Sequence, residues 1–321
     1  MTTCHLFVMD PINGINPLAD STYDIMLECQ ARGHEVWECQ IEELIVDKGA
    51  GFALSRRVRL KEVKALGEKY CETLQQERKA FADFNFVWMR KDPPVDNNFV
   101  AALLILGSAK SASIKVLNDP AGLLLANEKL WPLVVSPNLM PRTIVSSSRQ
   151  LLFDEAQKLG KIVLKPLFLA GGAGVMVFER DDRNLKSAID LLTLEGKSPA
   201  MLQQFIEGAE KGDKRIILVG GKPVGAVLRV PGASDHRANL HVGGVACKTD
   251  INEAERRICA QLEPLLMANG LHFVGIDVIN GLLTEVNVTS PTGLQEIDRL
   301  NHNKGSDRLR SKLVDYVLSI Y

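Results

Sequence analysis

The chain has 321 residues, 46% of them hydrophobic, which is enough to bury a large core and predicts two or three domains. Lysine and arginine together number 38, and aspartate and glutamate number 39, so the formal net charge is −1. Such a balance gives no global field that attracts a polyanion, and we expect no nucleic-acid partner.

The cysteines and the start of the chain indicate the compartment. The six cysteines are diluted in a long chain without a CxxC spacing, so neither a zinc site nor a disulfide framework is indicated. Residues 1–9 lack the basic region and cleavage site of a signal peptide, and no apolar run reaches about 18 residues. We expect a soluble, cytoplasmic protein with no membrane partner.

The first third of the chain alternates predicted strands and helices, which is typical of a parallel sheet covered by helices. Residues 21–24 read as a capping box that starts a helix, and Gly33 ends it. The predicted strands lie at 6–9, 36–39, 84–89 and 114–117, and the helices at 21–33 and 97–106.

A second region follows a linking stretch that contains prolines at 132, 137 and 141. Apolar spacing predicts helices at 151–160 and 250–269, and Gly270 closes the second of them. The predicted strands lie at 161–165, 175–178, 201–206, 215–219 and 224–230, with a turn at Gly220-Gly221.

The segments 273–279 and 282–288 form a predicted β-hairpin whose register depends on its loop. With a two-residue loop, Asn280-Gly281, two polar residues would share a face with apolar ones. With a three-residue loop and a glycine bulge, residue 279 pairs with 283, and 277 pairs with 285. We prefer the longer loop because an uncompensated buried carboxylate is costly.

In the preferred register, Asp277, Glu285 and Asn287 converge on one face of the hairpin, opposite residues 274, 276, 278, 284, 286 and 288. Two carboxylates and an amide oxygen are hard ligands suited to Mg²⁺, which takes further ligands from substrate phosphates. The face therefore predicts a metal site for phosphate chemistry. The alternative is an ordinary amphipathic hairpin with a polar outer face.

Residues 165–175 join two predicted strands through a loop of small residues, which lets backbone N–H groups approach phosphates. The loop is neither a Walker motif nor a dinucleotide fingerprint. Lys165 before the loop and Lys129 upstream could each place an ammonium group against a triphosphate. A plain hairpin connection with solvated lysines is the alternative. The strand at 201–206 could meet an adenine edge, or could be an ordinary core strand.

These segments together resemble the bacterial-type glutathione synthetase family of ATP-grasp ligases over nearly the whole chain. The matching segments are 8–12 (VMDPI), 89–94 (MRKDPP), 127–129 (NEK), 164–167 (LKPL), 171–173 (GGA), 212–215 (GDKR), residues 237 and 239, 274–277 (VGID) and 284–292 (TEVNVTSPT). The resemblance implies an α/β protein with three parts. These are an N-terminal parallel-sheet α/β domain at 1–122, and an ATP-grasp fold of two α+β subdomains, a lid at 123–204 and a catalytic subdomain at 205–321.

The resemblance also implies roles for individual residues. For ATP these are Lys129 and Lys165 on the phosphates, Gly171 and Gly172 in the covering loop, Gln204, Phe205 and Ile206 at the adenine, and Asp213 at the ribose. Asp277, Glu285 and Asn287 would bind two Mg²⁺ ions, with Mn²⁺ as an alternative. Arg215, Arg229 and Arg237 suit the γ-phosphoryl group and a substrate carboxylate, and Arg90, Asn239, Ser290 and Thr292 the peptide substrate.

The function implied is glutathione synthesis from γ-glutamylcysteine, glycine and ATP through an acyl phosphate, by a homo-oligomer for which the family suggests a tetramer. The chain departs from the family at 168–170 (FLA), where an acidic residue and a glycine are usual, and at 231–236 and 241–242. These departures leave open a related ligase with another amine acceptor. A non-catalytic nucleotide-binding descendant is a further alternative.

Overall fold

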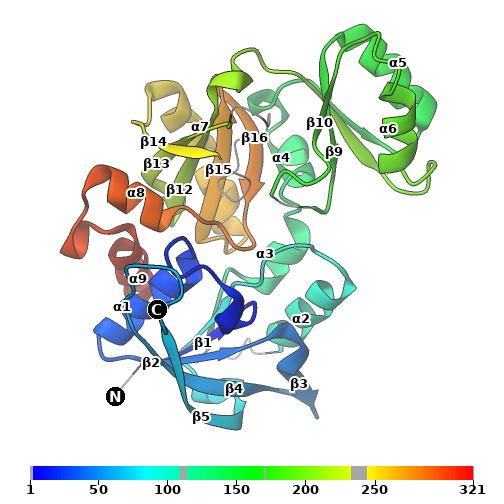
Figure 1. Ribbon diagram of the computed structural model, residues 1–321. Helices are drawn as coiled ribbons and strands as arrows, with labels where there is room; N and C mark the ends of the chain where they lie inside the picture. Colours follow the sequence, from blue (N-terminus) through cyan, green and yellow to red (C-terminus); the bar gives the residue numbers. More distant parts are fainter. Residues whose placement is uncertain (1–2, 109–113, 170, 233–243, 321) are drawn as a thin grey trace.

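The computed structural model describes residues 3–108, 114–169, 171–232 and 244–320 (Figure 1). Its N-terminal sheet has seven strands in the order β3-β4-β2-β1-β6-β7, with β5 paired to β4. The predicted parallel core is confirmed, because β1 pairs in parallel with β2 and β6, and β6 with β7. These strands are β1 (Cys4–Val8), β2 (Glu35–Cys39), β6 (Phe86–Met89) and β7 (Lys115–Leu117), and the helices are α1 (Ser21–Ala31) and α2 (Asn97–Gly107).

An antiparallel extension of this sheet was not predicted. It consists of β3 (Leu44–Asp47), β4 (Ala50–Leu60) and β5 (Cys71–Ala80), and all their pairings are antiparallel. Most of β5 is exposed and polar, so it lacks the apolar alternation that identifies a strand. The N-terminal sheet is therefore mixed rather than parallel throughout.

Helix α1 begins where the sequence predicts, but with a different cap. The side chain of Asp20 accepts a hydrogen bond from the Tyr23 amide at 2.7 Å, so Asp20 is the N-cap. The hydroxyl of Ser21 instead accepts the amide N–H groups of Gly293 and Leu294, at 3.2 and 3.4 Å. Ser21 thus joins the N-terminal domain to the C-terminal part of the chain.

The second sheet has four antiparallel strands in the order β10-β9-β11-β8 and lies within the range predicted as the lid. Two helices pack on it, and residues of α5, α6 and the strands share one hydrophobic cluster. The elements are β8 (Thr143–Ser146), α5 (Arg149–Leu159), β9 (Ile162–Pro166), β10 (Met176–Phe178), α6 (Leu185–Leu192) and β11 (Ala200–Gln204), reached through α3 (Pro120–Leu125) and α4 (Leu130–Val135).

The third sheet has five strands in the order β14-β13-β12-β15-β16, all antiparallel. The capping box of Asn252 and Glu255 starts α7, with bonds of 2.8 and 2.9 Å. The elements are β12 (Asp213–Val219), β13 (Lys222–Val230), β14 (Val245–Lys248), α7 (Glu253–Ala268), β15 (Phe273–Ile279), β16 (Leu282–Asn287), α8 (Leu294–Asn301) and α9 (Leu309–Ile320).

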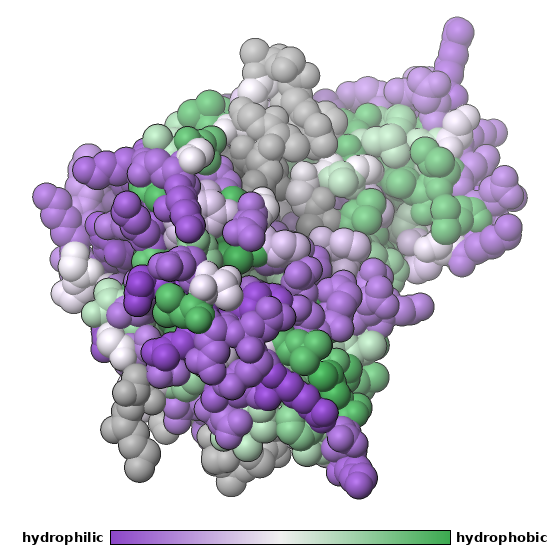
Figure 2. Space-filling view, turned by 60° about the horizontal axis from the view of Figure 1, so that its bottom comes forward, coloured by the Kyte–Doolittle hydropathy of each residue, from purple (hydrophilic) through white to green (hydrophobic). Residues whose placement is uncertain are grey.

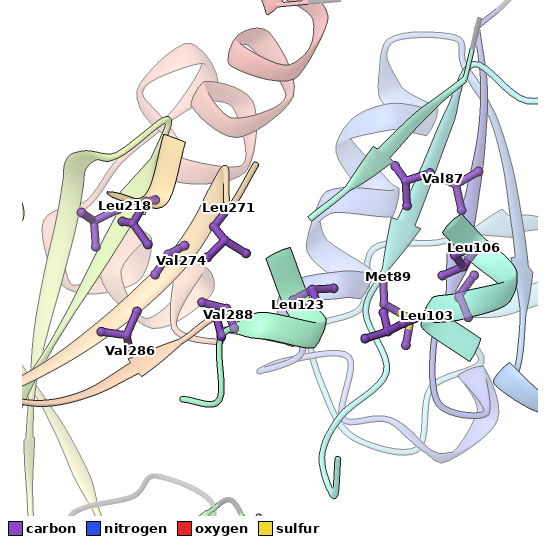
Figure 3. Packing of buried hydrophobic residues seen from close by; sticks show 14 of the residues in the cluster. Val87, Met89, Leu103, Leu106, Leu123, Leu218, Leu271, Val274, Val286 and Val288 are labelled. Carbon is purple, nitrogen blue, oxygen red and sulfur yellow. The ribbon is translucent and has the colours of Figure 1, made fainter. Parts of the chain in front are cut away.

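One hydrophobic core connects the first and third sheets, and α3 lies between them (Figure 3). Leu123 of α3 belongs to this core, as do Met89 of the N-terminal sheet and Val288 beyond β16. Gly122 lets α3 pack against the backbone of Asn269. A Cβ atom at residue 122 would lie 2.0 Å from the Asn269 carbonyl oxygen and would clash with it. The first and third sheets are therefore joined through α3, which packs closely on the backbone at Asn269.

The face of the molecule in Figure 2 is mostly hydrophilic, with hydrophobic side chains gathered in separate groups. No helix in the described ranges has the length and apolar character needed to span a bilayer.

Candidate active site

The β15–β16 hairpin places the three predicted metal ligands on one face, but with a different loop. The loop is the two-residue Asn280-Gly281, with φ of 46° and 77°, so the predicted three-residue loop is wrong. Residue 279 pairs with 282, not with 283, and Thr284 is the extra residue of a bulge. Beyond this bulge Asp277 pairs with Glu285, as predicted.

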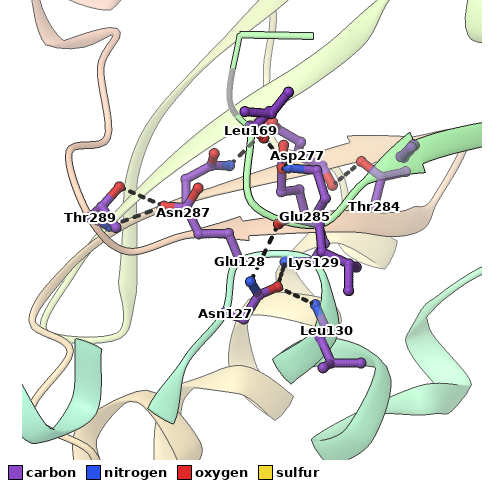
Figure 4. Close-up of polar contacts among 12 residues, drawn as sticks. Asn127, Glu128, Lys129, Leu130, Leu169, Asp277, Thr284, Glu285, Asn287 and Thr289 are labelled. Atoms are coloured by element: carbon purple, nitrogen blue, oxygen red, sulfur yellow. Dashed lines mark hydrogen bonds and ion pairs between the residues drawn. The ribbon is translucent and has the colours of Figure 1, made fainter. Parts of the chain in front are cut away.

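The bulge decides which residues face the core. Leu283 is fully buried and joins Val286 in the core, while the Thr284 hydroxyl donates to the carbonyl of Asp277 at 3.1 Å. Asp277 and Asn287 approach directly, because Nδ2 of Asn287 lies 3.2 Å from Oδ2 of Asp277 (Figure 4). The convergence of the polar side chains is confirmed, and a bulge in the strand produces it.

Two arginines hold the buried Asp277 carboxylate. Arg215 donates to both of its oxygens, at 2.5 and 3.0 Å, and Arg229 approaches Oδ2 at 3.0 Å. Burial alone would raise the pKa of Asp277, but Arg215 and then Arg229 lower it well below its usual range. The carboxylate is therefore ionised throughout the physiological range, as a metal ligand must be.

Arg229 also binds the predicted ribose contact. Its guanidinium donates to both oxygens of Asp213, at 2.6 and 2.7 Å, from the neighbouring strand β13. Arg215 fits beside Asp277 because Gly275 has no side chain, and a Cβ atom there would lie 3.0 Å from Cδ of Arg215. The arginines and carboxylates thus form one network of opposite charges.

Lys129 contacts both the β15–β16 hairpin and the loop after β9. Its side chain is 7% exposed, and Nζ lies 2.7 Å from Oε1 of Glu285. Nζ also donates to the carbonyl oxygen of Leu169 at 2.7 Å (Figure 4). Burial alone would lower the pKa of Lys129, but the Glu285 carboxylate raises it, so the ammonium stays charged.

Lys165 lies on β9, and hydrogen bonds link it to the next two strands of the sheet, β11 and β8. Its Nζ donates to Oε1 of Gln203 at 2.8 Å, and Nε2 of Gln203 donates to the Thr143 hydroxyl at 2.9 Å. Burial lowers the pKa of Lys165, and Glu285 partly offsets this effect. Sequence reasoning missed Gln203, which stands beside the predicted adenine contact Gln204 and is almost fully buried.

The loop after β9 turns at Gly171 and Gly172, whose φ angles of 69° and 76° favour glycine. The apolar pair Phe168 and Leu169 is exposed, at 49% and 43%. Ala170 lies outside the described residues. The loop therefore presents small residues and a half-exposed apolar pair beside Lys129.

The predicted adenine segment lies at the end of β11. Gln204 is exposed, and Ile206 is buried. The ring of Phe205 lies 4.3 Å from Nζ of Lys161, and its amide N–H donates to the Lys161 carbonyl at 3.1 Å. The backbone donor of Phe205 is therefore already used by the neighbouring strand.

Three of the predicted peptide-site residues, Arg90, Ser290 and Thr292, lie within the described residues. Arg90 is 4% exposed, donates to the Pro291 carbonyl and the Thr22 hydroxyl at 3.0 Å each, and burial lowers its pKa to about 10. The carbonyl of Thr292 accepts from Arg215 at 3.4 Å. Ser290 and Thr292 are half-buried, in the turn that Arg90 supports. The predicted Arg237 and Asn239 lie outside the described residues.

The donor set fits a magnesium ion. It offers two carboxylates and an amide on adjacent strands, beside two lysines suited to phosphates. Glu128 is the residue next to this set that sequence reasoning left without a role, although it lies in the matched segment 127–129. It is buried, and its carboxylate accepts three hydrogen bonds from Val288 and Thr289.

Comparisons with known proteins show which family the chain belongs to. Residues 4–123 match the prokaryotic glutathione synthetase N-terminal domain, and residues 128–302 match the ATP-grasp domain of the same family. The chain is 42% identical to the glutathione synthetase of Thermosynechococcus vestitus over 92% of this chain and 94% of that protein. It is 41% identical to that of Prochlorococcus marinus subsp. pastoris, over 97% and 99%.

Solved structures support the fold. The crystal structure of D-cycloserine synthetase DcsG superposes with a TM-score of 0.68 at 14% identity, over 99% of both chains. The ATP-grasp ligase PsnB superposes with a TM-score of 0.62 at 15% identity, over 99% of this chain and 98% of that one. Together with the matched domains, these findings establish that the chain belongs to the prokaryotic glutathione synthetase family, whose members are ATP-dependent ligases of the ATP-grasp fold.

Proposed function

We propose that this protein joins γ-glutamylcysteine to glycine and converts ATP to ADP and phosphate. One observation carries the proposal. Lys129, Glu285, Asp277 and Asn287 meet at one site, in a chain that shares 42% identity with a glutathione synthetase. Such a cluster of cations and oxygen ligands suits the transfer of a phosphoryl group to a carboxylate.

The proposed reaction has two steps. The cysteinyl carboxylate of γ-glutamylcysteine attacks the γ-phosphorus of ATP, and the bond to ADP breaks, which gives an acyl phosphate. The amine of glycine then attacks the acyl carbon, phosphate leaves with the electron pair of the C–O bond, and the amine loses a proton. No nucleophilic side chain is needed, so catalysis rests on positioning and charge stabilisation.

The chain's own residues fill these roles. Lys129 and Lys165 hold the phosphates, and Gly171 and Gly172 cover them. Arg215, Arg229 and Arg237 bind the transferring group and the substrate carboxylate. Two Mg²⁺ ions, or Mn²⁺ in their place, would be held by Asp277, Glu285 and Asn287 and would neutralise charge on the phosphates.

The remaining contacts complete the proposal. ATP lies between the lid subdomain 123–204 and the catalytic subdomain 205–321, beyond the N-terminal domain 1–122. Gln204, Phe205 and Ile206 meet the adenine, and Asp213 the ribose. Arg90, Asn239, Ser290 and Thr292 bind the peptide. The protein works in the cytoplasm as a homo-oligomer, with a tetramer as the expected state.

A second candidate is a ligase that uses another amine. The observation that favours it is the exposed pair Phe168 and Leu169, in the loop expected to cover the phosphates. A mobile loop that closes on the bound substrates would bring this apolar pair against the protein or the amine.

One experiment tests both candidates. Glycine, alanine, serine and β-alanine are offered together with γ-glutamylcysteine and ATP, and the products are separated by mass. High preference for glycine with release of ADP and phosphate is expected. A poor reaction with glycine would favour the second candidate, and release of AMP and pyrophosphate would contradict both.

A further inference from the structure

Glu128 covers the free edge of the strand that carries two metal ligands. Among the described residues, β16 is the last strand of its sheet, so one side of its backbone has no strand partner there. The main-chain carbonyl of Glu128 accepts the Val286 amide at 2.9 Å, and Oε1 accepts the Val288 amide at 2.9 Å. Oε1 also accepts the amide and the hydroxyl of Thr289, at 3.1 and 2.8 Å (Figure 4).

These bonds bracket Asn287. The residues on either side of it, Val286 and Val288, both donate their amide N–H groups to Glu128, so the backbone at 287 has little freedom. Glu128 is buried, and its carboxylate oxygen Oε1 accepts three of these hydrogen bonds. A hydrogen bond to a carboxylate is stronger than one between neutral groups.

The neighbours of Glu128 touch the other parts of the site. Lys129 lies 2.7 Å from Glu285 and binds the Leu169 carbonyl. Nδ2 of Asn127 donates to the Leu167 carbonyl at 3.3 Å, and its Oδ1 accepts the amides of Lys129 and Leu130. Residues 127–129 therefore contact strand β16, the proposed metal ligand Glu285 and the loop after β9.

We propose that Glu128 is a positioning residue that fixes Lys129 in register with the ligands Glu285 and Asn287, and so sets the affinity for magnesium-bound nucleotide. The proposal rests on the proposed ATP site. It requires the length and acceptor oxygen of the glutamate side chain, and it does not require that the side chain touch a ligand.

Two substitutions separate position from charge. Glu128→Gln keeps the length and an acceptor oxygen for the three donors, whereas Glu128→Asp keeps the charge but is one methylene too short. We expect the dissociation constant of magnesium-bound AMPPNP, measured by calorimetry without peptide or amine, to rise at least about tenfold in Glu128→Asp. In Glu128→Gln it should stay within about threefold of the wild-type value.

A matched control is Glu38→Gln on β2. Glu38 is also a buried glutamate, and its two carboxylate oxygens accept from Arg56 at 2.5 and 3.1 Å, in the N-terminal sheet, where no nucleotide contact is proposed. It should lose thermal stability and keep the wild-type dissociation constant. Both Glu128 variants are checked for folding by circular dichroism before binding is measured.

The outcomes are decisive. If Glu128→Asp binds like the wild type, or if Glu128→Gln is the weaker binder of the two, the positioning role is wrong. If Glu128→Asp fails to fold, Thr289→Val, which removes one donor to Oε1, takes its place and should still weaken nucleotide binding. Turnover of wild-type protein with γ-glutamylcysteine and glycine tests the proposed function separately, because a wild type that binds nucleotide without making glutathione would overturn only that function.

Discussion

Nζ of Lys129 lies 2.7 Å from Oε1 of Glu285, so a predicted phosphate-binding cation and a predicted metal ligand form an ion pair. The Glu285 carboxylate raises the pKa of Lys129 and keeps its ammonium charged in a mostly buried setting, where an unpaired charge would be costly. The ion pair places both charges where we propose that magnesium-bound nucleotide lies.

Replacement of Glu285 should affect catalysis more than binding. In Glu285→Gln the side chain keeps its shape but loses the charge that would hold a metal ion. We expect kcat to fall by about 10²-fold or more, because the stabilisation matters most as charge develops on the transferring group. The dissociation constant of ATP should change less than kcat.

Stopped-flow measurement of ADP release gives kcat. Equilibrium binding gives the dissociation constant of ATP. Glu253→Gln on α7 is the control, because its side chain is 74% exposed and no role at the site is proposed for it. A Glu285→Gln protein that turns over normally would remove this residue from the metal site.

The two lysines should both contribute to nucleotide affinity. Lys129→Met and Lys165→Met each remove one charge-assisted contact, and we expect the dissociation constant of ATP to rise about tenfold or more in each. Lys129→Met should also lower the free energy of unfolding, because it leaves Glu285 without its ammonium partner.

The control for this pair is Lys158→Met on α5, where the lysine is 66% exposed. It should leave ATP affinity unchanged. Unchanged affinity in both Lys129→Met and Lys165→Met would count against the phosphate role of these residues.

The polar face of the hairpin could be predicted from the sequence, but its loop could not. Alternation of side chains reports only the net offset between two strands, and an extra residue in the loop or at Thr284 gives the same pairing of Asp277 with Glu285. Positive φ at both Asn280 and Gly281 suits the shorter loop, because Asn and Gly adopt positive φ more readily than other residues do.

Contacts between segments far apart in the chain could not be predicted either, because a local pattern of residues does not report them. Asp20 and Ser21 are both good caps, and the choice between them depends on Gly293 and Leu294, which lie far along the chain. The edge strand β5 is polar on most of its length, so no apolar period marks it. Glu128 and Gln203 act through neighbours that only the fold brings together.

Close packing of α3 predicts a sharp effect of one methyl group. Gly122→Ala would place Cβ 2.0 Å from the Asn269 carbonyl oxygen, so the helix or that backbone must move. We expect a loss of about 1–3 kcal/mol in the free energy of unfolding, measured with urea. Gly107→Ala is the control, because its Cβ would meet no atom of the described residues within 4 Å. Equal stability of the two variants would contradict the packing described for α3.

Acid should destabilise the N-terminal domain through His5. Nε1 of Trp88 donates to Nδ1 of His5 at 3.1 Å, so the His5 proton lies on Nε2, which is 3.0 Å from Nδ1 of His34. Burial, with a smaller effect from His34, lowers the pKa of His5 to about 3. The folded chain therefore keeps His5 neutral where an unfolded chain protonates it, below about pH 6.5.

The sign follows from proton linkage. Because the unfolded state binds more protons below pH 6.5, the stabilisation is complete above that pH and is lost as the pH falls towards 3, by up to about 1.4 kcal/mol per pH unit. His5→Phe removes this titration, although it also removes the bond to Trp88 and should be less stable at pH 8. Urea unfolding at pH 8, 6 and 5 should therefore give a shallower loss of stability in His5→Phe than in the wild type. Between pH 7 and 8 the two proteins should differ by a constant amount, and parallel curves down to pH 5 would mean that His5 is protonated in the folded state.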